Sequence, residues 1–167
     1  MVYKKEMTLE FDALSENESF ARACVASFCL SLDPSLDELN DIKTAVSEAV
    51  TNCVVHAYPQ EKGKVVVNVR IEDKSIYIKI KDFGVGISDV DKAQQPFFTS
   101  KPSRERSGMG FTIMEGFMDN VRVHSVPNFG TEVEFVKKVS GNDCILQGGE
   151  SVTNFGYSRV NKVSTRR

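Results

Sequence analysis

Hydrophobic residues follow two different periods along the 167 residues of this chain. A period of two, typical of strands with one buried face, occurs in residues 7–12, 64–71, 75–81, 121–126 and 131–139. A period of three to four, typical of amphipathic helices, occurs in residues 17–32, 35–58 and 110–118. Residues 88–110 follow no period, and we interpret this long segment as a functional lid.

This order of elements predicts an α+β fold. We expect a two-layer α/β sandwich in which helices cover one face of a mixed, mostly antiparallel sheet. In residues 75–81, Ile76, Ile78 and Ile80 share one face, whereas Tyr77 and Lys79 lie opposite, so the second face should be partly solvated. We expect the domain to span residues 1–139. Residues 140–167 are polar and rich in Gly, Ser and Asn, which predicts a poorly ordered tail.

Composition and charge exclude several classes of protein. The chain is 41% hydrophobic and 26% charged, and its net charge of -2 gives no general electrostatic reason to bind nucleic acid. It has no apolar run of about 20 residues and no apolar stretch typical of a signal peptide at its start, so we expect a cytoplasmic protein that does not enter membranes. The cysteines form no CxxC pair, and Cys24, Cys29 and Cys53 lie in apolar surroundings, which indicates core residues rather than a zinc site.

Three polar residues of the second predicted helix carry the first candidate chemistry. Glu48, Asn52 and His56 are spaced four apart and so share one face. Such a face can be an ordinary solvated stripe, but it borders Ala49 and Cys53, and asparagine is a poor residue for a helix interior. A metal ion with its waters and phosphates would satisfy a buried Asn52, and Glu48 could then accept a proton. His56 lies in the last turn, where backbone carbonyls can satisfy it, and we give it no catalytic role.

The second candidate is the segment from Asp82 to Ile87, which contains Gly84 and Gly86. Asp82 ends a strand whose isoleucine face should be buried. Burying part of a carboxylate costs roughly several kcal/mol of folding free energy unless the group is hydrogen-bonded. The exocyclic amine of adenine is a donor of the right kind. An aspartate that merely caps a turn would explain the same pattern.

The third candidate is Ser107-Gly108-Met-Gly110, directly before a predicted helix. Glycines let backbone N–H groups approach an anion, and a helix N-terminus favours negative charge. Lys101, Arg104 and Arg106 precede it and could reach phosphates, although a solvated basic loop is the alternative.

These segments, in this order, resemble the Bergerat-type (GHKL) ATP-binding family of gyrase, Hsp90, histidine kinases and MutL. In that comparison, residues 48–52 resemble the N box, residues 82–86 the first glycine box, and residues 108–110 the second. Thr131, in Gly130-Thr-Glu-Val, resembles the threonine that helps to bind adenine.

Further segments narrow the resemblance. Residues 17–22, 33–34, 47–52 and 96–102 resemble the sporulation anti-sigma factors that are also serine protein kinases, and the resemblance runs from about residue 7 to 139. It implies a homodimer that binds a sporulation sigma factor and keeps it from RNA polymerase. It also implies a kinase that uses ATP and Mg²⁺ to phosphorylate a serine of an anti-anti-sigma factor.

The same resemblance implies roles for individual residues. Glu48 is the expected general base and Asn52 the magnesium ligand, while Asp82 and Thr131 are expected to hold adenine. The remaining candidates are four glycines that shape the phosphate and lid region, an arginine at the γ-phosphate and an arginine for partner docking: Gly84, Gly86, Gly108, Gly110, Arg104 and Arg22.

Other members of the broad family fit less well. An ATPase of the gyrase or MutL kind needs transducer segments for which this length leaves no room. A histidine kinase needs a helical hairpin with a phosphoacceptor histidine, and neither His56 nor His124 lies in one. An anti-sigma kinase of the stress-response type, or an ATP-binding module without kinase activity, remains an alternative; intact Glu48 and Asn52 argue against the latter.

Overall fold

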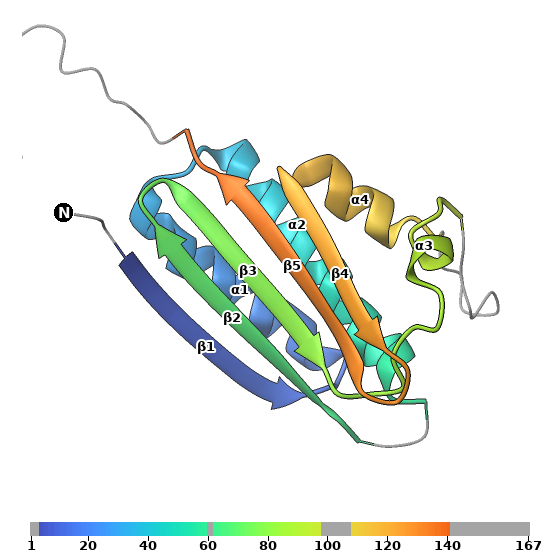
Figure 1. Cartoon of the computed structure of the whole chain (residues 1–167). Coiled ribbons are helices and arrows are strands. Elements are labelled where there is room, and N and C mark those ends of the chain that lie inside the picture. Colours follow the sequence, from blue (N-terminus) through green and yellow to red (C-terminus); the bar gives the residue numbers. More distant parts are fainter. Residues whose placement is uncertain (1–3, 60–61, 98–107, 141–167) are drawn as a thin grey trace, which may run out of the picture.

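A five-stranded sheet forms one layer of the computed structural model, which describes residues 4–59, 62–97 and 108–140 (Figure 1). The strand order is β1-β2-β3-β5-β4. The strands are β1 (Lys4–Asp12), β2 (Lys64–Glu72), β3 (Ser75–Asp82), β4 (Asn120–Val126) and β5 (Gly130–Lys138). This arrangement confirms the predicted α+β sandwich.

One detail of the predicted sheet is wrong, because every pairing between neighbouring strands is antiparallel rather than mixed. The chain leaves β3, passes through α4 and returns as β4 in the same direction as β3. The hairpin partner β5 then inserts between β3 and β4 and pairs antiparallel with both. A parallel pair is thereby avoided.

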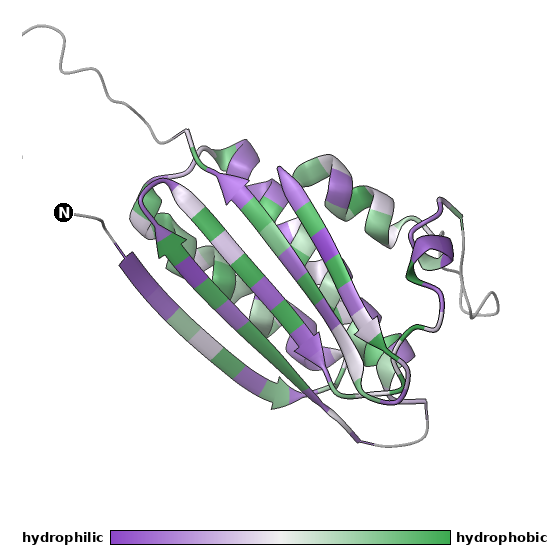
Figure 2. Cartoon of the chain, viewed as in Figure 1, coloured by the Kyte–Doolittle hydropathy of each residue, from purple (hydrophilic) through white to green (hydrophobic). Residues whose placement is uncertain are grey.

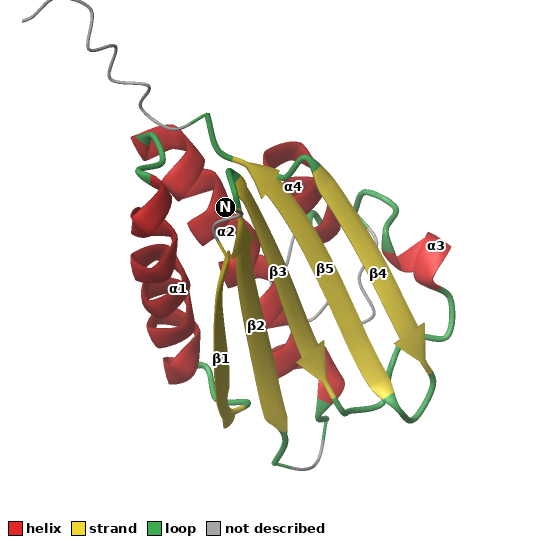
Figure 3. Ribbon diagram, turned by 60° about the vertical axis from the view of Figure 1, so that its left-hand side comes forward, coloured by secondary structure: helices red, strands yellow, loops and turns green. Residues whose placement is uncertain are grey.

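The helices cover one face of this sheet (Figure 3). They are α1 (Glu16–Cys29), α2 (Leu36–Asn52) and α4 (Gly110–Phe117), and a 3-10 turn, η1 (Leu30–Leu32), follows α1. The core contains the alternating residues of β2 and β3, such as Val67 and Ile78, packed against Val46 and Val50 of α2. Figure 2 shows the alternation of apolar and polar residues along the strands. Tyr77 and Lys79 lie on the open face and are partly exposed, as predicted.

Helix α2 presents the candidate residues to the site. It begins with a capping box, in which the Ser35 Oγ accepts from the N–H of Glu38 and Glu38 Oε2 accepts from the N–H of Ser35, at 3.2 and 2.8 Å. Its regular part ends at Asn52, and a π-helical turn, η2 (Cys53–Ala57), replaces the α-helix expected as far as residue 58. Such turns are frequent at functional sites, and this one directly follows Asn52.

The segment after β3 is partly regular. Residues Val90–Ala93 form a short helix, α3, because Asp89 Oδ1 accepts a hydrogen bond from the N–H of Lys92 at 2.9 Å. The predicted lid residues Lys101, Arg104 and Arg106 lie outside the described residues, as does the predicted tail beyond Ser140.

Two simpler expectations concern the membrane and the cysteines. Within the described part of the chain, no helix has the length and apolar character that crossing a membrane requires. Cys29 and Cys53 are buried as predicted, whereas Cys24 is only half-buried.

Candidate functional site

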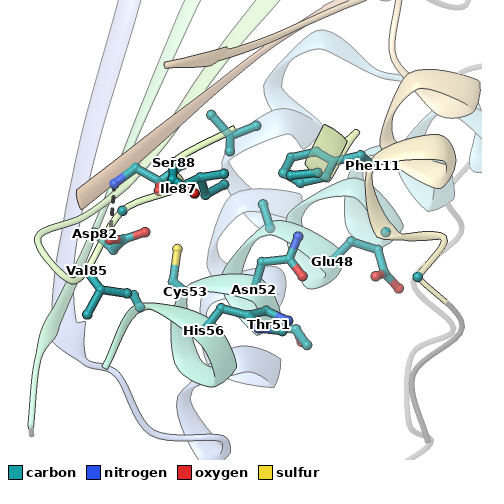
Figure 4. Close-up of a pocket in the computed structure, with 18 of the residues that line it drawn as sticks. Glu48, Thr51, Asn52, Cys53, His56, Asp82, Val85, Ile87, Ser88 and Phe111 are labelled. Carbon is teal, nitrogen blue, oxygen red and sulfur yellow. Dashed lines mark hydrogen bonds between the residues drawn. The ribbon is translucent and has the colours of Figure 1, made fainter. Parts of the chain in front are cut away.

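A cavity of about 860 Å³ lies between α2, η2, the loop after β3 and the start of α4 (Figure 4). A cavity of this size suits a small organic ligand. Ala49, Ile87, Phe111 and Val133 supply apolar lining. The lining also includes most of the residues that the sequence singled out: Glu48, Asn52, Asp82, Gly86, Gly108, Gly110 and Thr131.

Asp82 lies at one end of this cavity, at the last position of β3. Its exposed fraction is 3%, and it is the only buried charged or polar residue in the part of the chain that the structure describes. Its Oδ1 accepts hydrogen bonds from the N–H groups of Gly84 and Thr131, at 3.0 and 3.1 Å. Burial raises the pKa of Asp82, while these two bonds and the thiol of Cys53 act in the opposite direction. The carboxyl group is thus held firmly, with capacity left to accept from a ligand.

Cys53 lies beside Asp82 and also lines the cavity (Figure 4). Burial raises the pKa of its thiol well above the usual value, and the neighbouring Asp82 carboxylate raises it further. A protonated thiol is a weak nucleophile, so the site is not built for cysteine chemistry. The Cys53 thiol and the Asp82 carboxyl group instead influence each other's pKa as close neighbours in the lining.

Glycines fix the loop that follows Asp82. A β-carbon at Gly84 would lie 2.0 Å from the carbonyl oxygen of Ala57, and the N–H of Val85 donates to the same oxygen at 2.9 Å. Gly86 has φ +67°, and a β-carbon there would lie 2.3 Å from the carbonyl oxygen of Val126. Gly84 therefore seats the loop against η2 and does not line the cavity, whereas Gly86 does.

Glu48 and Asn52 lie at the other end of the cavity, where α2 meets the start of α4 (Figure 4). A β-carbon at Gly110 would lie 3.1 Å from Glu48 Oε2 and 3.5 Å from Asn52 Nδ2. Gly110 is also the first residue of α4, and Gly108 before it has φ +64°. The structure thus brings the glutamate, the asparagine and the second glycine segment together at a helix N-terminus, which favours anions.

Thr131 joins the Asp82 end of the cavity through two bonds. Its N–H donates to Asp82, and its hydroxyl is hydrogen-bonded to the Ser125 hydroxyl at 2.9 Å. The sequence interpretation missed Ser125, although a polar residue on the inward-facing side of β4, in register with Val121 and Val123, is a signal that could have found it.

Tyr58 is a second residue that the sequence interpretation missed. Its hydroxyl accepts from the N–H of Phe83 at 2.7 Å and donates to the carbonyl of Lys64 at 2.6 Å. It therefore connects the end of η2 to the loop after Asp82 and to the start of β2.

Besides Gly84, two of the sequence candidates lie away from the cavity or among the residues that the structure does not describe. Arg22 of α1 contacts Glu18 at 3.2 Å and donates to Ser47 Oγ at 3.0 Å, and its side chain is 39% exposed. It does not line the cavity. Arg104 belongs to the undescribed residues 98–107. His56 lines the cavity, and the structure gives no reason to assign it a catalytic role.

The described residues offer few side-chain ligands for a metal ion. Among residues 4–59, 62–97 and 108–140, no group of three or more His, Cys, Asp or Glu could hold one. Magnesium does not need such a group, because it commonly uses one or two protein ligands together with phosphates and waters. Asn52, which lies beside the N-terminus of α4, fits that requirement.

Comparison with protein families defines the class to which this fold and cavity belong. A model of the histidine kinase-like ATPase domain matches residues 11–137, which include both ends of the cavity. The matched domain type implies that this chain binds ATP.

Similar proteins with assigned names point to one family within this class of ATPase domains. The anti-sigma F factors of Bacillus velezensis and Bacillus subtilis are each 56% identical over 138 residues, which cover 82% of this chain and 94% of each relative. The anti-sigma F factor of Pasteuria penetrans is 55% identical over 141 residues, 83% of this chain and 94% of that protein. The chain belongs to the anti-sigma F factor family of histidine kinase-like ATPase domains, which confirms the resemblance.

A solved structure supports the fold alone. A Mycobacterium tuberculosis crystal structure of RsbU and RsbW domains matches with a TM-score of 0.59 at 17% identity, over 81% of this chain and 32% of that one.

Proposed function

We propose that this chain is an ATP-dependent protein serine kinase that also binds and inhibits a sporulation sigma factor. The protein substrate is a serine of an anti-anti-sigma factor, and the working form is a homodimer. The names of the relatives support the anti-sigma part. The observation that carries the kinase part is the cavity, with a buried carboxyl at one end and a glutamate–asparagine pair against a helix N-terminus at the other.

The Asp82 end of the cavity binds the base. The carboxyl of Asp82 accepts from the exocyclic amine of adenine, and the Thr131 hydroxyl lies beside it. Ile87, Phe111 and Val133 give the base apolar walls. A buried carboxyl is costly unless it is hydrogen-bonded, and the amine of adenine would add a donor to the N–H groups of Gly84 and Thr131.

The other end binds the triphosphate. The N–H groups at the start of α4 attract the phosphates, and glycine at positions 108 and 110 allows their close approach. Asn52 holds Mg²⁺, whose charge neutralises the phosphate oxygens when it is bound. Arg104 is the proposed γ-phosphate contact, and Arg22 the proposed docking residue for a partner.

Glu48 acts as the general base. It lies one helical turn before Asn52 and beside Gly110, so it borders the end of the cavity where the γ-phosphate would lie. There it accepts the hydroxyl proton of the substrate serine as the phosphoryl group is transferred.

A Glu48→Gln variant tests this proposal. It should retain ATP binding in calorimetry, while transfer of labelled γ-phosphate to the anti-anti-sigma protein falls by about 10²- to 10⁴-fold. Glu6→Gln, an exposed change on the open face of the sheet, is the matched control and should transfer normally. Near-normal transfer by Glu48→Gln would refute the assigned role.

A further inference from the structure

The hydroxyl of Ser125 lies at a junction of three segments that meet at the Asp82 end of the cavity. It contacts the N–H of Ile87 at 2.7 Å, the carbonyl oxygen of Gly130 at 3.0 Å and the hydroxyl of Thr131 at 2.9 Å. Ile87 follows the loop after β3, whereas Gly130 and Thr131 begin β5. Ser125 therefore joins the loop after Asp82 to the strand that carries Thr131.

The direction of each bond follows from what a hydroxyl can offer. A serine hydroxyl has one hydrogen to donate and two lone pairs to accept with. The N–H of Ile87 can only donate, so it occupies one lone pair. The carbonyl of Gly130 can only accept, so it takes the single hydrogen. One lone pair remains for Thr131, and Thr131 must therefore donate its own hydrogen to Ser125.

This direction determines what Thr131 presents to the cavity. With its hydrogen committed to Ser125, the Thr131 oxygen can only accept from a ligand. The carboxylate of Asp82 can also only accept, and its Oδ1 already accepts from the N–H groups of Gly84 and Thr131. Asp82 and Thr131 thus both present hydrogen-bond acceptors to a base bound at this end of the cavity.

We propose that Ser125 is a positioning residue that makes this end of the cavity selective for a base with an amino group at its edge. This inference rests on the proposed binding of ATP. An adenine 6-amine offers hydrogens to both acceptors, whereas a 6-oxo purine turns its own carbonyl lone pairs toward them. A site with buried acceptors rejects a ligand that leaves them unpaired.

The test compares ATP with inosine triphosphate, which carries an oxo group at position 6, by calorimetry with the full chain. The wild-type protein should bind ATP more tightly. Ser125→Ala frees the Thr131 hydrogen to point into the cavity, so the ratio of the two affinities should fall by about three- to tenfold. Ser125→Thr, which keeps a hydroxyl, should restore the ratio.

A double-mutant cycle separates this role from general loosening of the strand. In a Thr131→Val background no hydroxyl remains for Ser125 to orient, so adding Ser125→Ala should leave the ratio unchanged. An unchanged ratio in the single Ser125→Ala variant, or an equal fall in the Thr131→Val background, would overturn the inference. Failure of the wild-type protein to bind either nucleotide would instead overturn the proposed function itself.

Discussion

At the scale of single residues, Asp82 combines a structural cost with a proposed binding role. It is the one buried charged side chain in the described part of the domain, and burial raises its pKa. A carboxyl whose pKa is higher in the folded than in the unfolded state favours folding only while it is protonated. That contribution is complete below the unfolded pKa and is lost as the pH rises through the folded pKa. At neutral pH the ionised Asp82 should therefore destabilise the free protein.

An Asp82→Asn variant should remove the destabilisation that the ionised carboxyl causes at neutral pH. The amide oxygen of asparagine can still accept from the N–H groups of Gly84 and Thr131, but it carries no charge to desolvate. Relative to the wild-type protein, the variant should gain unfolding free energy as the pH rises from about 4 toward 7. Urea denaturation at a series of pH values measures this difference. A variant that becomes progressively less stable than the wild type over that range would contradict the expectation.

At the scale of elements, the loop after β3 is held by backbone contacts that permit no side chain. A β-carbon at Gly84 would meet the Ala57 carbonyl group of η2, and neither backbone can move without displacing Asp82 or η2. Residues 83–86 thus link the Asp82 end of the cavity to η2, which directly follows Asn52.

Gly84→Ala should lower the unfolding free energy by about 1–3 kcal/mol through this overlap. Gly116→Ala is the matched control within α4. A β-carbon there meets nothing within 4 Å, and alanine is favoured over glycine in a helix by up to about 1 kcal/mol. Denaturant unfolding of both variants gives the comparison. If the two substitutions changed stability equally, the close contact at Gly84 would not be a constraint.

The elements themselves could be predicted because hydrophobic period is a local property. Residues 75–81 and 121–126 alternate, and both are strands. The boundaries were less accurate where local hydrogen bonds decide: α1 ends at Cys29 in a 3-10 turn, and α2 continues as a π-helical turn after Asn52. The insertion of β5 between β3 and β4 depends on pairing across the whole domain, and no local pattern encodes it.

The site was predictable to the extent that its residues stand at unusual positions. Asn52 in a helix interior and Asp82 at the end of an apolar strand both attract attention in the sequence. Ser125 and Tyr58 are ordinary residues by sequence, and their contacts arise only when segments far apart in the chain meet. Gly84 is predicted to shape the phosphate and lid region, and its close contact with the Ala57 carbonyl of η2 could not be predicted from the sequence.

At the scale of the whole molecule, the ATPase-domain match at residues 11–137 lies within the described domain, and the alignment with the anti-sigma F relatives covers 94% of their length. One cavity side comes from the helical layer and the other from the ends of β3 and β5, so the two-layer architecture itself creates the site. The proposed ATP binding in the cavity, the proposed catalysis by Glu48 and the proposed selectivity through Ser125 all depend on this contact between the two layers.

The most direct test of this account is calorimetric titration of ATP with magnesium into the wild-type protein and Asp82→Asn. The wild-type protein should bind one nucleotide per chain, and the variant, folded and at least as stable at pH 7, should bind about tenfold or more weakly, because a charged acceptor for the base is lost. Equal affinities in the two folded proteins would contradict the assignment of this cavity as an adenine-binding site.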